Sequence, residues 1–454
     1  MNRRHFFPHP LLLPVLFFGI TILLGACLLH LGVSHGSSSF SWTDALFTAT
    51  SATCVTGLVV VDTGSFFTPF GQCVIMILIQ IGGLGIMTLT SLAFYLMRQR
   101  VSLTDRIAVG QNLLFDAEFN LGRFLVGIVA LTFSVELIGA VLLFMVVPEN
   151  ISFFHALFHS ISAFCNAGFS LYSDSLMRWQ SDIPVNLIFI GLIILGGLGF
   201  SVLAETGEWV FNRLSWNRKH RFRQLAWYAK VVLSTTLVLL IGGWIVLFFT
   251  ENIGYQEQVP LKTALVTSLF QSVTCRTAGF NTVEIGSMTN VSLMIMMFLM
   301  WVGGAPGSTA GGVKVTTLRV LTSFYSSQIM GRKQAVIGAI AVNRTTVNKA
   351  LVLTLFSLTL LACAVLLLHL TEGGDVLHSQ SRGLVVEIAF EVTSALGTAG
   401  LSTGLTGTLS FLGKYVIIVL MFVGRLGPLI FLALMQELQS EEVYYRPEGN
   451  LLIG

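Results

Sequence analysis

Four short polar loops, each centred on a glycine, are the residues of this chain whose types and spacing could do chemistry. They are Thr53–Leu58, Phe164–Phe169, Thr274–Asn281 and Leu396–Ser402, and each lies between apolar segments. Their central glycines, Gly57, Gly168, Gly279 and Gly400, are 111, 111 and 121 residues apart. Glycine permits backbone angles that aim carbonyl oxygens to one side. Rings of such oxygens can replace the water shell of a monovalent cation. The loops therefore predict one cation site that four parts of the chain build together.

The segments that must position these loops recur in one order: an outer apolar span, a shorter half-polar helix, the loop, and a second apolar span. The expected outer spans are Leu11–Leu31, Phe124–Val147, Val231–Phe249 and Ala350–Leu370. The short helices are expected at Trp42–Ala52, Phe153–Ala163, Leu261–Val273 and Leu384–Ser394, and the second spans at Phe70–Met97, Pro184–Leu203, Val291 onward and Tyr415–Leu434. We expect four repeats over residues 1–97, 98–212, 213–317 and 318–454, the last with a cytoplasmic linker and a C-terminal tail.

Composition places the chain in the membrane class. Only 10% of the residues are charged and 54% are hydrophobic, with a mean hydropathy of +0.81, whereas soluble domains carry about 25% charged residues. The long spans can cross a bilayer, which takes about 20 residues, but the short helices cannot. Irregular backbone at membrane depth is tolerated where it lines water. We therefore predict an all-α membrane protein with eight transmembrane segments and four re-entrant pore helices around a central pore. A cleaved signal peptide is the alternative for Leu11–Leu31.

A second glycine motif recurs in the second spans. Gly82–Gly85 matches Gly196–Gly199, and Gly303–Gly307 and Gly424–Gly427 continue the series. The distance from each loop glycine to the second position of the motif is 26, 29, 25 and 25 residues. Two motifs at matched offsets support the repeat. Glycine pairs in membrane helices also permit close helix packing, so packing and pore lining both remain open for them.

Charge distribution predicts the orientation. The N-terminus, the linkers 98–123, 213–230 and 319–349, and Arg446 hold most of the 25 basic residues. By the positive-inside rule both termini are expected in the cytoplasm, with the glycine loops opening outward. The opposite side carries many acidic residues, including Asp44, Asp62 and Glu391. They would concentrate cations near a mouth, or they are simply solvated loop charges.

The sequence contains no P-loop, Rossmann fingerprint or H-E-x-x-H. We predict a protein that is not an enzyme, with no nucleotide bound on this chain and no nucleic-acid partner. Cys54, Cys165 and Cys275 fall at or near one place in three loops, where a small side chain fits. His155 and His159 are four residues apart and share a helix face, so a metal site is the alternative to a structural role there.

The four loops, together with the run Gly303–Gly312, resemble the Trk/Ktr/HKT superfamily of cation-uptake proteins over residues 11–436. The resemblance implies a K+ filter to which each repeat contributes one loop. Some plant relatives carry serine in place of the first glycine and favour Na+; this chain keeps Gly57, so K+ is expected. The implied filter residues, which would bind K+ through their carbonyls, are Val55, Thr56, Gly57, Asn166, Ala167, Gly168, Thr277, Ala278, Gly279, Thr398, Ala399 and Gly400.

The same resemblance implies a gating loop where Pro306 and five glycines break the second span of the third repeat. Arg425 replaces the glycine of the other repeats and would form an electrostatic barrier to cations. A static kink, and a structural pairing of Arg425 with carbonyls or Glu, are the alternatives. Arg276 is expected to brace its loop, and the role of Lys314 stays open. The implied gate consists of Gly303, Gly304, Ala305, Pro306, Gly307, Ser308, Thr309, Ala310, Gly311, Gly312 and Arg425.

Because the chain begins at the first outer span, it looks more like the Ktr branch of the superfamily. That branch implies a homodimeric, multi-pass subunit of the bacterial plasma (inner) membrane that contacts lipid. It also implies K+ as the transported ion, Na+ as an activator, and gating by a cytoplasmic KtrA-like nucleotide-binding ring. An Na+-permeable or Na+/K+-coupled secondary transporter is the alternative function. A thiol-dependent intramembrane enzyme is a weaker rival that rests on isolated Cys and His residues.

Overall fold

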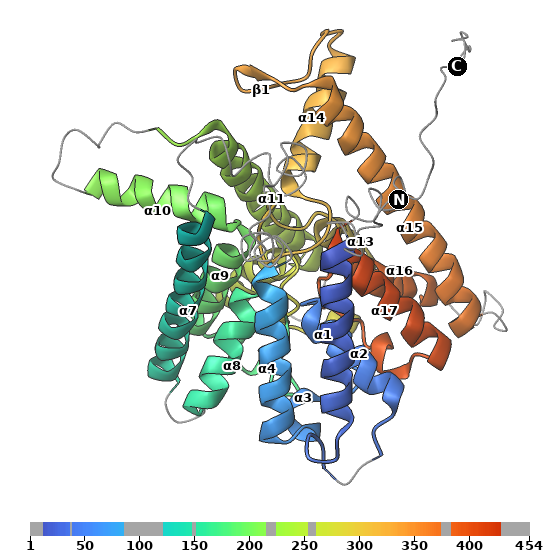
Figure 1. The fold of residues 1–454 in the computed structure, drawn as a ribbon. Coiled ribbons are helices and arrows are strands. Elements are labelled where there is room, and N and C mark those ends of the chain that lie inside the picture. The colour runs from blue at the N-terminus through green and yellow to red at the C-terminus, as the bar shows by residue number, and fades with distance from the viewer. Residues whose placement is uncertain are drawn as a thin grey trace, which may run out of the picture.

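The computed structural model of the chain describes residues 12–36, 39–85, 121–147, 151–214, 224–252, 260–373 and 383–427. Its helices follow one order four times (Figure 1). The outer helices are α1 (Leu12–His30), α7 (Leu121–Val146), α11 (Trp227–Asn252) and α15 (Arg344–Gly373). The short helices are α2 (Trp42–Thr53), α8 (Phe153–Phe164), α12 (Leu261–Thr274) and α16 (Leu384–Gly397). The second helices are α4 (Pro69–Gly83), α9 (Ile183–Gly197), α13 (Asn290–Trp301) and α17 (Phe411–Leu426).

Each second helix begins at a side-chain cap. Thr68, Asp182, Thr289 and Ser410 each accept a hydrogen bond from the backbone N–H three residues further on. Such caps satisfy one of the free donors at a helix start and contribute about 1 kcal/mol each. Three of these helices also end near a glycine with positive φ, namely Gly85, Gly199 and Gly427. The four helices are 12–16 residues long, and in α4, α9 and α17 the cap and the glycine mark the two ends.

The expectation of one continuous span over Pro184–Leu203 is wrong. Helix α9 ends at Gly197, and α10 (Phe200–Leu214) leaves it at an angle of 112°. The cause is Gly199, whose φ of 85° no helix can accommodate. Helix α10 then projects sideways from the rest of the molecule (Figure 1).

Three described helices are long and apolar enough to cross a bilayer: Leu125–Val146, Trp227–Asn252 and Arg344–Gly373. A fourth span results if the bent α9–α10 pair is taken as one. The remaining apolar helices are shorter. The expected spans Phe70–Met97 and Tyr415–Leu434 run past Gly85 and Gly427 into residues outside the described part, so eight complete spans stay a prediction.

The repeats close into a ring through one recurring contact. The second helix of each repeat packs on the short helix of the next: α4 on α8, α9 on α12, α13 on α16, and α17 back on α2. Buried hydrophobic clusters fill the four seams, and a fully buried phenylalanine from each short helix enters them: Phe47, Phe158, Phe270 and Phe390. The four short helices are therefore held around a common centre.

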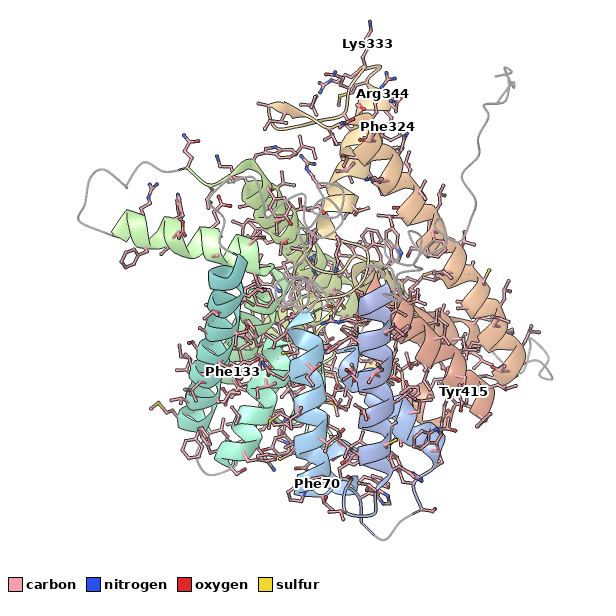
Figure 2. All side chains as sticks on the ribbon, viewed as in Figure 1. Phe70, Phe133, Phe324, Lys333, Arg344 and Tyr415 are labelled. Carbon is pink, nitrogen blue, oxygen red and sulfur yellow. The ribbon has the colours of Figure 1, made fainter. Side chains whose placement is uncertain are left out.

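A small hairpin lies at one end of the molecule. Helix α14 (Val315–Ile329) and α15 are joined through β1 (Val336–Ile337) and β2 (Ile340–Ala341), which pair antiparallel. Figure 2 shows Lys333 and Arg344 at this end, far from Phe70 at the other end of the molecule. Sequence reasoning expected only a basic linker here. Because Gly338 adopts a φ of 65° at the turn, these residues form a defined structure instead.

Candidate functional site

The central glycines of the four loops meet at one place. A Cβ built on Gly57 would lie 3.1 Å from the Cα of Gly168 and 3.3 Å from that of Gly400. A Cβ on Gly279 would lie 2.9 Å from the Cα of Gly168 and 3.3 Å from that of Gly400. Each glycine thus approaches its two neighbours in the order of the repeats. No side chain fits inside this ring, so main chain alone lines its centre.

Each loop contains two residues with positive φ, separated by one other residue. Val55, Asn166, Thr277 and Thr398 have φ between 50° and 65°, and the glycine two residues later is also positive in every loop. A non-glycine residue at positive φ is uncommon and carries strain of about 1 kcal/mol or more. Four such residues at matched positions mean that the fold imposes this conformation. The four loops thus share one backbone conformation around the common centre.

Side-chain hydroxyls at the ends of the short helices hold the loops in place. Ser51 Oγ accepts from the N–H of Gly57 at 3.1 Å. Ser162 Oγ donates to the carbonyl of Phe169 at 2.8 Å, and Thr274 Oγ1 donates to that of Phe280 at 2.6 Å. These bonds span the turn and tie the first three loops to their own helices, whereas the matching hydroxyl of the fourth repeat, Ser394, has no partner within the described residues.

The residues before each glycine turn their side chains into the protein. Every filter residue expected from the sequence lies in these loops, and the non-glycine ones are at most 1% exposed. The hydroxyls of Thr56, Thr277 and Thr398 have no hydrogen-bond partner within the described part of the chain. The structure therefore brings all twelve residues together, with the side chains buried and the four glycines in mutual contact.

On one side of the ring lies a cavity of about 410 Å³. It reaches the four central glycines, and the rest of its lining mixes apolar side chains with hydroxyl and amide ones, among them Ser170, Tyr172, Asn281 and Ser402, and with the carboxylate of Asp62. Glu391, expected on the solvated acidic face, is instead fully buried in α16. Sequence reasoning missed this burial, because Glu391 stands between Phe390 and Val392 and no local pattern indicates the partners that a buried carboxylate needs.

The glycine-rich stretch after α13 is a packed loop. It starts and ends in a parallel bridge between Val302 and Val313. The N–H groups of Ala305 and Thr309 donate to the carbonyls of Gly197 and Gly196 at 3.0 and 3.2 Å, which ties the loop to α9. A Cβ on Gly311 would lie 2.0 Å from Thr398 Oγ1. The loop thus passes directly against the fourth glycine loop.

Three buried or half-buried cations surround this loop, and all of them donate to main-chain carbonyls. Arg276 donates to Gly303 at 2.8 Å, which fits the brace expected of it. Lys314 Nζ donates to Ala310 at 2.8 Å. Arg425 donates to Thr309 and Gly82, so the pairing with carbonyls considered as its alternative role is present. Positive charge is therefore concentrated where the loop meets the ring.

The histidines and cysteines singled out in the sequence have structural partners. His159 is fully buried and stacks on Tyr172 with ring centroids 5.1 Å apart. Within the described residues no group of three or more His, Cys, Asp or Glu side chains could hold a metal ion. Cys165 donates to Glu136 at 3.6 Å, and its Sγ lies where a Cβ on Gly83 would be only 2.2 Å away. Its tight packing agrees with the small-side-chain explanation.

Apolar helices of membrane-spanning length around four glycine loops whose main chains meet define an integral membrane protein of the transport class. A family model described as TrkH, a cation transport protein, matches residues 18–443. The chain belongs to this family, whose members are cation transporters and not enzymes.

The similar proteins agree with this assignment. The chain is 39% identical to the Ktr system potassium uptake protein B of Bacillus subtilis, covering 99% of this chain and 97% of that one. It is 37% identical to the potassium/sodium uptake protein NtpJ of Enterococcus hirae, covering 96% and 95%. The crystal structure of the potassium transporter TrkH from Vibrio parahaemolyticus has the same fold, with a TM-score of 0.75 at 20% identity over 96% of this chain and 86% of that one.

Proposed function

We propose that this chain is a K+-selective, channel-like uptake subunit in which the four glycine loops form the selectivity filter. The observation that carries the proposal is the mutual approach of Gly57, Gly168, Gly279 and Gly400, each at positive φ. Such a ring presents carbonyl oxygens at fixed positions, and these replace the hydration shell of K+. The relatives named as potassium uptake proteins support K+ as the transported ion.

The glycine-rich loop 303–312 and Arg425 form the gate of this pathway. The loop lies against Thr398 of the fourth filter loop, and the guanidinium of Arg425 holds it through Thr309. A cation leaving the filter would pass these positive charges, which raises the energy of the ion there. Closure by this loop thus combines a steric and an electrostatic barrier.

The hairpin end of the molecule lies in the cytoplasm in this proposal. The basic residues around the hairpin, including Lys333 and Arg344 (Figure 2), support a cytoplasmic location for that end by the positive-inside rule. Both termini are then cytoplasmic, and the cavity over the filter faces outward. Stimulation by Na+, a homodimer, and control by a cytoplasmic nucleotide-binding ring complete the proposal, supported by the similarity to the Ktr protein B of Bacillus subtilis.

Uptake of K+, Rb+ and Na+ by cells that lack their own K+ uptake systems tests this function. The parent chain should restore growth at low K+, and Gly279→Ser should lose most of the preference for K+ over Na+. A Gly279→Ser chain that keeps the full preference would refute the filter.

A second candidate is a secondary transporter that couples Na+ and K+ flux. It is favoured by one observation, the relative from Enterococcus hirae named for both ions. Fluxes in vesicles distinguish the two: a fixed ratio of Na+ to K+ movement supports coupling, whereas K+ flux that is independent of an Na+ gradient supports the channel-like pore.

A further inference from the structure

One buried polar residue occupies a matching position in each short helix. Three residues after each of them comes a hydroxyl residue, Ser51, Ser162, Thr274 or Ser394, and the first three of these tie their loops. The four buried residues are Thr48, His159, Gln271 and Glu391. All four are at most 2% exposed. Within the described part of the chain the side-chain polar atoms of Thr48 and Gln271 have no partner. Those of His159 and Glu391 do, and both contact the rim of the cavity.

His159 and Glu391 make the same pair of contacts in the second and fourth repeats. His159 Nε2 lies 3.0 Å from Ser170 Oγ and accepts from the N–H of Leu171 at 3.3 Å. Glu391 Oε1 accepts from Ser402 Oγ and from the N–H of Thr403 at 3.1 Å. Ser170 and Ser402 each lie two residues after a central glycine, and both line the cavity.

These contacts fix the direction of both serine hydroxyls. His159 Nδ1 lies 2.7 Å from the carbonyl of His155, which can only accept, so Nδ1 carries the proton of the neutral ring and Nε2 is the acceptor. Ser170 must therefore donate to His159. An ionised carboxylate only accepts, so Ser402 donates to Glu391 in that state.

One lone pair on each serine oxygen remains available. The N–H of Tyr172 donates to Ser170 Oγ at 3.0 Å, and that of Gly404 donates to Ser402 Oγ at 2.9 Å. Thr406 Oγ1 is 3.1 Å from Ser402 Oγ, but it is closer to Glu391 Oε2 at 2.7 Å, which takes its proton. A hydroxyl oxygen has two lone pairs, so each serine keeps one for the cavity.

We propose that Ser170 and Ser402 form an outer site for a partly dehydrated monovalent cation, and that His159 and Glu391 are positioning residues that keep these hydroxyls pointing their oxygens at the ion. The two repeats involved are not neighbours in the ring, so the oxygens approach from different sides of the cavity. The proposal deepens the function proposed above and rests on it. An outer site of this kind would capture K+ before the filter and would set the apparent affinity of uptake.

The test measures the K+ dependence of uptake in cells that lack their own K+ uptake systems. Ser170→Ala and Ser402→Ala should each raise the KM for K+ about three- to tenfold with the maximal rate nearly unchanged. Glu391→Gln turns one of two acceptor oxygens into a donor, and should raise the KM in the parent but add nothing in a Ser402→Ala background. Thr48→Val, the matched change in the first repeat, should leave the KM at the parental value. Protein in the membrane and its melting temperature are measured for every variant.

Several outcomes would overturn the site. They are an unchanged KM in both serine variants, a fall in maximal rate without a change in KM, and effects of Glu391→Gln and Ser402→Ala that multiply instead of overlapping. A parent chain that restores no K+ uptake refutes the proposed function itself, whereas a functional parent with unaffected serine variants refutes only the outer site.

Discussion

The guanidinium of Arg425 donates to the main-chain carbonyl of Thr309 and, through its second nitrogen, to that of Gly82. Arg425 belongs to the last helix described, Thr309 to the glycine-rich loop and Gly82 to the first repeat, so one side chain joins three repeats. It is 8% exposed. Burying the charge of a guanidinium in this way costs free energy. The two carbonyls offset part of that cost and fix the position of the Arg425 side chain.

Removing this charge should open the proposed gate. We expect Arg425→Ala to increase K+ uptake about tenfold when no regulatory partner is present, because both the tether on the loop and the positive barrier are lost. Arg425→Lys keeps the charge but cannot reach two carbonyls with a planar fork. K+ uptake by this variant should therefore lie between that of the parent and that of Arg425→Ala. The measurement is Rb+ influx into vesicles; equal rates for all three chains would contradict this role.

Because the four loop glycines lie so close together, we expect ion selectivity to be strongly sensitive to a single added methyl group. A Cβ on Gly168 would lie 2.7 Å from the Cα of Gly279 and 2.8 Å from the carbonyl oxygen of Ala278. We expect Gly168→Ala to lower the preference for K+ over Na+ at least about tenfold, because the carbonyls must move apart. Gly242→Ala is the control, since nothing lies within 4 Å of a Cβ there. Competition uptake of the two ions gives the ratio, and parental selectivity in both variants would exclude a rigid ring.

The ion pair between Asp44 and Lys414 closes the ring between the first and fourth repeats. Lys414 Nζ lies 2.7 Å from Asp44 Oδ1, and both side chains are about one-fifth exposed. Partly exposed pairs contribute about 1 kcal/mol or less. Asp44→Asn and Lys414→Met should each lower the melting temperature in detergent slightly, and the double variant should be no worse than the poorer single one. Fully additive losses would mean that the two side chains do not interact.

Acid should weaken the contact between Asp174 and Arg178, which lie in the segment between α8 and α9. Hydrogen bonds from Arg178 lower the pKa of the Asp174 carboxyl below its usual value. A lowered pKa in the folded state means that the stabilisation is complete above the unfolded pKa of about 3.9 and is lost as pH falls through the folded value.

The stability difference between the parent and Asp174→Asn should therefore be constant from about pH 8 to pH 5 and shrink below about pH 4. Its size should stay under about 1 kcal/mol because the pair is exposed to solvent. Arg178→Met provides the control, since Asp174→Asn should have no pH-dependent effect in that background. Thermal unfolding in detergent as a function of pH measures both; a difference that grows in acid would contradict the assignment.

The sequence was most informative where one motif recurs at fixed spacing. Gly57, Gly168, Gly279 and Gly400 could be aligned because a turn that needs positive φ accepts little else, and the short helices are found within three residues of their expected ends. Helix α16 extends to Gly397, three residues further than expected, because Thr398 takes the left-handed conformation that ends it.

Long-range hydrogen bonds could not be predicted in this way. The bend after Gly197 was not predicted, because the apolar run continues past it: Phe200, Val202 and Leu203 are as hydrophobic as the helix before them. The burial of Glu391 depends on Ser402 and Thr406, which lie in a loop that folds back onto its helix. No local pattern encodes such a contact.

The ring of four loops belongs to one polypeptide, and this has a consequence for how its chemistry can be altered. In a pore made of identical subunits, each codon change affects every position around the axis at once. Here a single substitution changes one quarter of the lining and leaves the other three intact. Ion preference can therefore evolve in small steps, each of which leaves a functional protein. The opposite sides of the opening can also acquire different functions.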